Sequence, residues 1–154
     1  MSAITTRHAS LDDIDAVLPL FNMYRAFYGE PTRGVAARAF MRERWILGES
    51  KLIVAEAAGK IVGFTQLFPS FSSVTLQRLW ILNDLFVIEA VRGKGAGRKL
   101  LEAAADFGRA TFAKQLFIEG ALANTAARGL YEDFGFVPNA EYAYYHLALQ
   151  TAQK

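Results

Sequence analysis

The run Arg92-Gly93-Lys94-Gly95-Ala96-Gly97 is the feature that most constrains how this chain folds. It follows an apolar segment, residues 76–88, and precedes residues 101–112, where apolar side chains recur at spacings of three and four. This order predicts a strand, a tight glycine turn and an amphipathic helix. In such a turn, backbone N–H groups approach a phosphate closely, and the helix N-terminus adds about half a positive charge. The run therefore predicts an anion site, to which Arg98 adds a further cation.

Two common nucleotide motifs do not fit the run. A P-loop needs Gly-Lys-Ser/Thr at its end, whereas Gly97 is followed by Arg98-Lys99-Leu100. A dinucleotide fingerprint needs a third glycine at its sixth position, where this chain has Arg98 or Leu100, depending on the starting glycine. The predicted phosphate ligand is therefore of another kind.

The composition excludes several other classes of protein. The 154 residues suit one domain, residues 1–154, and 53% of them are hydrophobic, so a globular chain is expected. A net charge of only +2 does not indicate nucleic-acid binding, which needs clustered Lys and Arg. The chain has no cysteine, and neither His8 nor His146 has metal-site spacing around it, so we expect no metal.

The sequence shows no sign of a membrane protein. The most apolar stretch, residues 79–91, is interrupted by Asn83, Asp84 and Glu89, and it is shorter than the roughly 20 residues that cross a bilayer. No signal-peptide pattern stands at the N-terminus. We therefore expect a soluble, cytoplasmic protein without a membrane partner.

Hydrophobic periodicity predicts a mixture of helices and strands. Strands are expected at residues 4–7, 52–57, 61–68, 76–88, 115–119 and 142–149. Besides the helix after the glycine run, helices are expected after Ser10, at residues 32–47 and at residues 124–133. The helix at 32–47 is expected to bury four side chains, Val35, Ala39, Phe40 and Ile46. The fold class is therefore α/β of the mixed type, with an antiparallel meander followed by strand-helix-strand units.

A second motif lies downstream of the glycine run: Asn124-Thr125-Ala126-Ala127-Arg128-Gly129-Leu130-Tyr131-Glu132-Asp133-Phe134-Gly135-Phe136. The two motifs resemble the signatures of the GCN5-related N-acetyltransferases (GNAT), Gln/Arg-x-x-Gly-x-Gly/Ala and Asn-x-x-Ala-x-x-Leu/Phe-Tyr-x-x-x-Gly-Phe. The segment Leu85-Phe86-Val87 before the glycine run also resembles the family's fourth strand. The resemblance extends from Ile4 to Leu149.

This resemblance implies a fold and a cosubstrate. The family's fold is a central, mostly antiparallel twisted sheet of six to seven strands, splayed between strands 4 and 5, with helices on both faces. The cosubstrate is acetyl-CoA, and its acetyl group passes to a primary amine without a covalent enzyme intermediate.

The resemblance also implies roles for the motif residues. The glycine run and Arg98 would hold the pyrophosphate of acetyl-CoA. The strand Leu85-Phe86-Val87 would bind the pantetheine arm, and the backbone of Leu85 and Val87 would stabilise the oxyanion. Asn124 and Ala127 would lie near that arm. Tyr131 would protonate the departing thiolate as a general acid, because its phenol is protonated at pH 7.

The acceptor is less sharply indicated. The chain resembles the diamine and polyamine acetyltransferases and the small histone-acetyltransferase-like enzymes, through residues 82–87 and the aromatic segment that contains Tyr24, Tyr28 and Glu30. Those polyamine enzymes have a glutamate where this chain has Asn83, and an amide cannot act as a base. The neighbouring Asp84 would face the opposite side of the strand unless a bulge rotates it. Glu30 or an ordered water is the alternative base.

Each assignment has a simpler alternative. The glycine run can be a plain strand-to-helix connection, Tyr131 a packed aromatic, and Asn124 the N-cap of a helix. A catalytically silent acyl-CoA-binding sensor is the alternative function. A homodimer is also expected, with the apolar segment 142–147 forming part of its interface.

Overall fold

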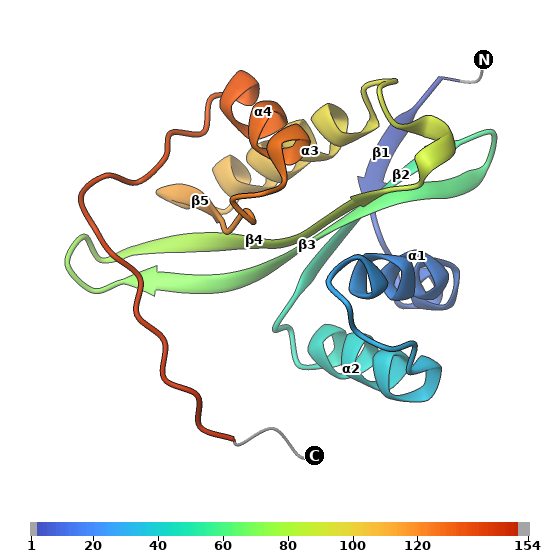
Figure 1. The fold of residues 1–154 in the computed structure, drawn as a ribbon, viewed down its shortest axis with the longest axis horizontal. Helices are drawn as coiled ribbons and strands as arrows, with labels where there is room; N and C mark the ends of the chain where they lie inside the picture. The colour runs from blue at the N-terminus through green and yellow to red at the C-terminus, as the bar shows by residue number, and fades with distance from the viewer. Residues whose placement is uncertain (1–2, 151–154) are drawn as a thin grey trace.

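The computed structural model describes residues 3–150, and its centre is a five-stranded sheet in the order β1-β2-β3-β4-β5 (Figure 1). The strands are β1 (Thr5–His8), β2 (Lys51–Ala57), β3 (Lys60–Ser72), β4 (Gln77–Val87) and β5 (Gln115–Ile118). All neighbouring pairs are antiparallel except β4 and β5, which are parallel. The mixed α/β class is thereby confirmed, and the sheet is mostly antiparallel as expected.

The predicted number of strands, six to seven, is wrong for the part of the chain that the structure describes. Residues 142–149 were expected to form the last strand, but they have no strand structure. A strand needs a neighbour for its backbone N–H and C=O groups, and none of the described strands pairs with this segment. Its alternating apolar pattern is therefore present without the pairing that would make it a strand.

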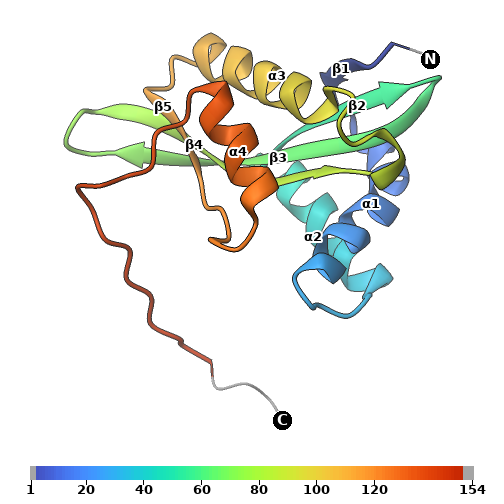
Figure 2. The same ribbon diagram turned by 45° about the horizontal axis from the view of Figure 1, so that its top comes forward.

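Helices cover both faces of the sheet, as expected (Figure 2). On one face lie α1 (Ile14–Phe27), which follows the short 3₁₀ turn η1 (Leu11–Asp13), and α2 (Gly34–Ile46). On the other face lie α3 (Ala96–Ala110), which follows the turn η2 (Glu89–Val91), and α4 (Thr125–Phe134). None of the helices within residues 3–150 is long and apolar enough to cross a membrane.

A separate apolar core lies on each face of the sheet. The core under α1 and α2 includes Val17, Phe21, Met41 and Phe64. The core under α3 is built by the following side chains from β3, β4 and α3: Leu67, Trp80, Leu82, Leu100, Leu101 and Ala104. Both α3, which the glycine run opens, and α4, which the second motif forms, pack on this core. The two sequence motifs therefore lie on the same face of the sheet.

The predicted buried face of α2 is wrong. Val35, Ala39 and Ile46 are exposed, and Phe40 is only partly covered, by stacking on Phe21 with ring centroids 6.4 Å apart. The buried side chains are instead Ala37 and Met41, a pair four residues apart on one side of the helix. The fully buried part of α2 is thus this narrow pair, and the partly buried Trp45 packs against the same core.

A β-bulge in β4 determines which face each of its side chains meets. Gln66 of β3 pairs with Asp84, but the next residue, Leu67, pairs with Leu82, so no residue of β3 stands opposite Asn83 in the register. Up to Leu82 the even-numbered side chains of β4 enter the core under α3, whereas after the bulge the odd-numbered ones, such as Leu85, do so. The extra residue therefore turns Asp84 to the face of α1 and α2.

We expect Gly63→Ala to destabilise the protein. A Cβ at Gly63 would lie 2.8 Å from the backbone oxygen of Phe86, and a backbone atom cannot move aside without disturbing β3 and β4. The expected loss is about 1–3 kcal/mol of unfolding free energy, measured by denaturant titration. The control is Gly129→Ala in α4, where nothing lies within 4 Å of the new Cβ; alanine should stabilise that helix by about 0.5–1 kcal/mol. Equal stability of the two variants would contradict the expectation.

Candidate active site

The inner half of β4 has an open backbone edge beside β5. The parallel pairing of β5 with β4 covers only residues 79–82, so within residues 3–150 no strand pairs with residues 83–87 on that side. The N–H of Ile88 donates to the carbonyl of Val62 at 2.9 Å, so this residue's N–H points toward β3. Because backbone direction alternates along a strand, the groups of Leu85 and Val87 point to the open edge. The expected splay between strands 4 and 5 is present.

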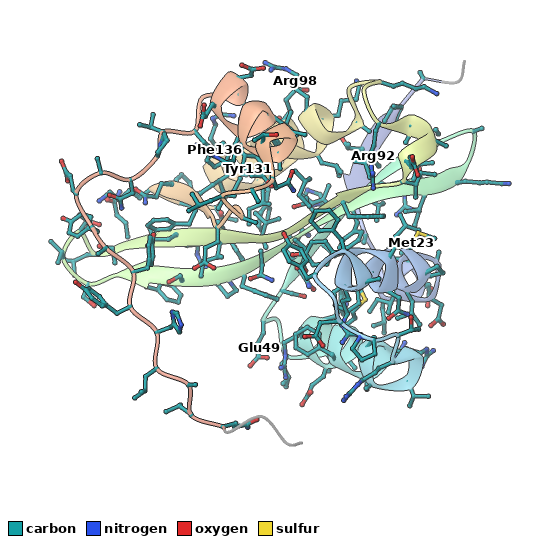
Figure 3. The ribbon with its side chains drawn as sticks, in the orientation of Figure 1. Met23, Glu49, Arg92, Arg98, Tyr131 and Phe136 are labelled. Carbon is teal, nitrogen blue, oxygen red and sulfur yellow. The ribbon has the colours of Figure 1, made fainter. Side chains whose placement is uncertain are left out.

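Phe86, the residue between them, has a different environment. Its ring enters the core under α1 and lies 6.3 Å from that of Phe64. The guanidinium of Arg92 lies over the Phe86 ring, 5.6 Å from its centroid. Arg92 Nε also donates to the Val87 carbonyl at 2.9 Å. Arg92 therefore spans from the glycine loop, residues 92–97, back to the open edge of β4 (Figure 3).

The glycine loop has the backbone that its sequence predicts. Gly93 and Gly95 have φ of 73° and 85°, in the left-handed region that glycine enters without strain, and Gly95 is the N-cap of α3. The first N–H groups of α3 have no partner within the helix and lie at the positive end of its dipole. Lys94 Nζ donates to the Ala90 carbonyl at 2.8 Å, and Arg98 pairs with Glu102 at 3.3 Å. The loop thus combines free amides with cations.

Gly97 has a packing role that the motif did not indicate. A Cβ at this position would lie 3.0 Å from Cδ2 of Leu130 in α4. The first turn of α3 therefore contacts α4 at a point where even a methyl group would require the Leu130 side chain to shift. Arg98 reinforces the contact, with its guanidinium 5.5 Å from the ring centroid of Phe134.

The second motif forms α4 with a cap at each end. The side-chain oxygen of Asn124 accepts a hydrogen bond from the N–H of Ala127 at 3.2 Å, so the predicted N-cap is confirmed. Gly135 ends the helix with φ of 116°. These two caps define where α4 begins and ends.

Tyr131 lies on the side of α4 that packs on the core under α3. Its ring contacts that of Phe136 edge-on, with centroids 6.0 Å apart, and the two labelled side chains lie side by side in Figure 3. Burial raises the pKa of the Tyr131 phenol, with a smaller contribution from Tyr28. Among residues 3–150, no hydrogen bond occupies the hydroxyl. A protonated phenol without a partner is suited to donate a proton.

A pocket of about 380 Å³ lies on the opposite face, between α1, α2 and the bulge of β4. We call it the acceptor pocket; it is lined by Phe21, Tyr24, Arg25, Arg33, Ala36, Ala37, Phe40, Gln66, Asn83 and Asp84. The structure thus brings three of the sequence-predicted acceptor residues together: Tyr24, Asn83 and Asp84.

Asp84 is the buried charge of the acceptor pocket, with 3% of its surface exposed. Gln66 Nε2 donates to its Oδ2 at 2.6 Å, and Asn83 Nδ2 donates to its Oδ1 at 2.9 Å. Burial raises the pKa of the Asp84 carboxyl, although Gln66, the nearby Tyr24 hydroxyl and Asn83 lower it in part. The Tyr24 hydroxyl donates its proton to the Asn83 carbonyl at 3.1 Å, which ties α1 to the bulge.

Two other predicted acceptor residues lie outside the pocket. Glu30 is exposed and pairs with Arg25 Nη2 at 3.7 Å. Tyr28 is half-exposed, with its ring edge-on to Tyr24 at 5.2 Å. Glu30 is therefore not placed to substitute for the missing glutamate.

Sequence reasoning missed Gln66 and Arg33. Gln66 interrupts the apolar strand 61–68, and a polar side chain in such a strand needs a buried partner, which is the signal that could have identified it. Arg33 lies before α2 in a segment without a motif, so nothing in the sequence pointed to it.

Comparison with known proteins assigns the arrangement to a family. The family model described as Acetyltransferase (GNAT) family matches residues 17–136. An uncharacterized N-acetyltransferase of Bacillus subtilis (strain 168), YhfO, is 43% identical over 141 residues, which make up 92% of this chain and 95% of the relative. A probable acetyltransferase of Haemophilus influenzae is 36% identical over 108 residues, which make up 70% of this chain and 74% of the relative.

Solved structures agree with these matches. The crystal structure of a probable acetyltransferase superposes with a TM-score of 0.89 at 35% identity, covering 97% of this chain and 99% of that one. A ribosomal-protein-alanine N-acetyltransferase from Brucella melitensis biovar Abortus 2308 shares the fold, with a TM-score of 0.80 at 20% identity over 96% of this chain and 100% of the other. With the two motifs in place on one face of the sheet, the chain belongs to the GNAT family of acetyltransferases.

Proposed function

We propose that this acetyltransferase moves the acetyl group of acetyl-CoA directly onto a primary amine of a small molecule or peptide, within one catalytic domain spanning residues 1–154. The observation that carries the proposal is a pair of proton-handling groups on the two faces of the open β4 edge. The Tyr131 phenol lies on the α4 side, and the Asp84 carboxylate lies on the α1 and α2 side. A donor lying along the edge would have an acid on one side and a base on the other.

The residues present fit acetyl-CoA. When bound, it supplies an acetyl thioester, the activated acyl group of the reaction. The glycine loop and the first N–H groups of α3 would hold its pyrophosphate, because they combine free amides, a helix dipole and cations. The outward backbone groups of Leu85 and Val87 would hydrogen-bond its arm as a neighbouring strand does. Asn124, whose oxygen caps α4, keeps its side-chain N–H₂ for the same arm.

The two titratable groups divide the proton transfers between them. Asp84 accepts the proton that the amine loses, and its raised pKa brings this carboxylate closer to the range of an effective base. Tyr131 gives its proton to the departing sulfur, and its raised pKa ensures that the phenol is still protonated at neutral pH. The bulge explains how Asp84 serves although Asn83 replaces the glutamate of the polyamine enzymes.

The charges of the acceptor pocket favour a small primary amine over a polyamine. Arg25 and Arg33 line the pocket together with Asp84. A polycation would meet Arg33 and the Arg25 that pairs with Glu30, with Asp84 as the buried carboxylate of the pocket, whereas a single ammonium can pair with Asp84 alone. The aromatic side chains of Phe21 and Phe40 would cover the apolar part of such an acceptor.

We also include a homodimer in the proposal, because the apolar side chains of residues 142–147 are exposed in the single chain. The cytoplasmic location stays a prediction.

Tyr131→Phe is expected to lower kcat by about 10²–10⁴-fold, the contribution of a positioned general acid. The dissociation constant of acetyl-CoA should stay unchanged, because the ring and its contact with Phe136 remain. Stopped-flow turnover and calorimetric binding measure the two quantities separately. The control is Tyr144→Phe, which removes a phenol hydroxyl from the exposed C-terminal segment. Unchanged turnover in Tyr131→Phe would remove the acid assignment and favour a different proton donor.

Asp84→Asn is expected to change the pH profile of kcat/KM. Asp84 acts as a base only when ionised, so the activity of the parent should fall as the pH drops through its raised pKa, which lies above the ordinary 3.8. In Asp84→Asn this acidic limb should be lost and the remaining rate should be low. The pH limb that belongs to the amine itself would persist in both proteins. Asp106→Asn, which removes an exposed carboxylate of α3, is the control, and an acidic limb that survives in Asp84→Asn would contradict the base assignment.

The acceptor class is tested by release of CoA from acetyl-CoA with a panel of monoamines, polyamines, amino acids and amino-terminal peptides. Mass spectrometry of the products identifies the acetylated nitrogen. We expect monoamines to give a higher kcat/KM than polyamines. If no member of the panel released CoA, the small-amine assignment would be wrong.

A further inference from the structure

The acceptor pocket has guanidinium groups that acetyl transfer to a simple amine does not use. Of the described residues that line the pocket, Asp84 alone is acidic, whereas Arg25 and Arg33 are basic. Asp84 is buried and Arg33 is exposed. The pocket therefore extends from a buried carboxylate, which would take the proton of the amine, to an exposed guanidinium.

The two arginines differ in their surroundings. Arg25 is held by the loop after α1, because its Nη1 donates to the Pro31 carbonyl at 2.9 Å and its Nη2 lies 3.7 Å from a carboxylate oxygen of Glu30. Within residues 3–150, no hydrogen bond or ion pair involves the Arg33 guanidinium. Arg33 is therefore the cation of the pocket whose donors are available to a ligand.

We propose that the acceptor is an amino acid, and that Arg33 recognises its carboxylate. The amine would lie at Asp84, and the carboxylate would meet the guanidinium at the exposed end of the pocket. This assignment rests on the proposed function, because it names the class of primary amine that the same site acetylates.

The guanidinium group of Arg33 suits a carboxylate in geometry as well as in charge. Its planar fork donates two parallel hydrogen bonds, which the two oxygens of a carboxylate accept together. Because Arg33 is exposed, a carboxylate bound there would keep part of its hydration. The pair would then not carry the full desolvation penalty of a buried ion pair.

The balance of charge in the pocket also favours an amino acid. A simple ammonium would pair with Asp84 and leave Arg33 without an opposite charge among the lining residues. A zwitterion adds no net charge, and each of its two charges meets an opposite one. Once Asp84 has accepted the proton of the amine it is neutral, and the carboxylate of the acceptor would be the anion that remains beside Arg33.

The size and the apolar wall of the pocket fit a molecule of this kind. The volume of about 380 Å³ lies near the lower end of the roughly 300–1,000 Å³ of small-molecule pockets. Phe21 and Phe40, whose stacked rings line the pocket, would cover an apolar side chain of the acceptor. The first residue of a peptide has an amide in place of the free carboxylate, so Arg33 would distinguish an amino acid from a peptide.

The test compares amino acids with their amides, in which a neutral carboxamide of nearly the same size replaces the carboxylate. Alanine, leucine and phenylalanine are each paired with their amide, and release of CoA gives kcat/KM for every compound. For the pair with the highest turnover, the ratio of acid to amide should be about tenfold lower in Arg33→Gln than in the parent, because a charge-assisted contact is lost. The intrinsic reactivities of the two amines cancel, since the same pair is assayed with both proteins.

Arg38→Gln is the control, because it removes a guanidinium from α2 outside the pocket lining; its ratio should equal that of the parent. An unchanged ratio in Arg33→Gln, including an equal loss for acid and amide, would overturn the amino-acid assignment alone. Release of CoA with other monoamines but with no amino acid would do the same. If no amine of any class released CoA, the proposed function and the amino-acid assignment would both be wrong.

Discussion

The bulge at Asn83 is the feature on which the site depends. Without the extra residue, Asp84 would share the face of Leu82 and enter the apolar core under α3, where an ionised carboxylate has no partner. With it, Asp84 turns to the face of α1 and α2 and receives donors from Gln66 and Asn83. Bulges also bend a strand and end regular pairing. The same residue therefore lies where β4 leaves β5 and its backbone edge opens.

The chemistry-bearing parts of the fold could be predicted because they are local. The positive φ angles of Gly93 and Gly95 follow from a tight turn that only glycine enters freely, and the cap at Asn124 follows from its side-chain oxygen. Each feature depends on a few consecutive residues, so the sequence contains all the information that it needs. The order of the two motifs along the chain then indicated that they would meet.

The rest could not be predicted because it depends on partners distant in sequence. Whether Asp84 faces one side or the other depends on its register with β3, which no local pattern reveals. The buried stripe of α2 depends on close approach to α1, so the small Ala37 is covered while the larger Val35 is exposed. Residues 142–149 have a strand's pattern, but a pattern becomes a strand only when an edge is available to pair with it. Glu30 likewise looked suitable by charge, and its position relative to the pocket is a property of the tertiary fold.

The contact between Gly97 and Leu130 has a mechanical consequence for the enzyme. It joins the end of the site that would bind phosphate to the helix that carries Tyr131, through the Leu130 side chain packed on the bare backbone of Gly97. The spacing between those two parts is thus maintained by direct helix contact and not by the loops that connect them. The packing of α3 on α4 would set the distance between the phosphate site and the Tyr131 phenol. A thioester would then reach the phenol only when the arm between it and the phosphates matches that distance. Selectivity for the donor would then reside in the seam between α3 and α4 as much as in the charges of the loop.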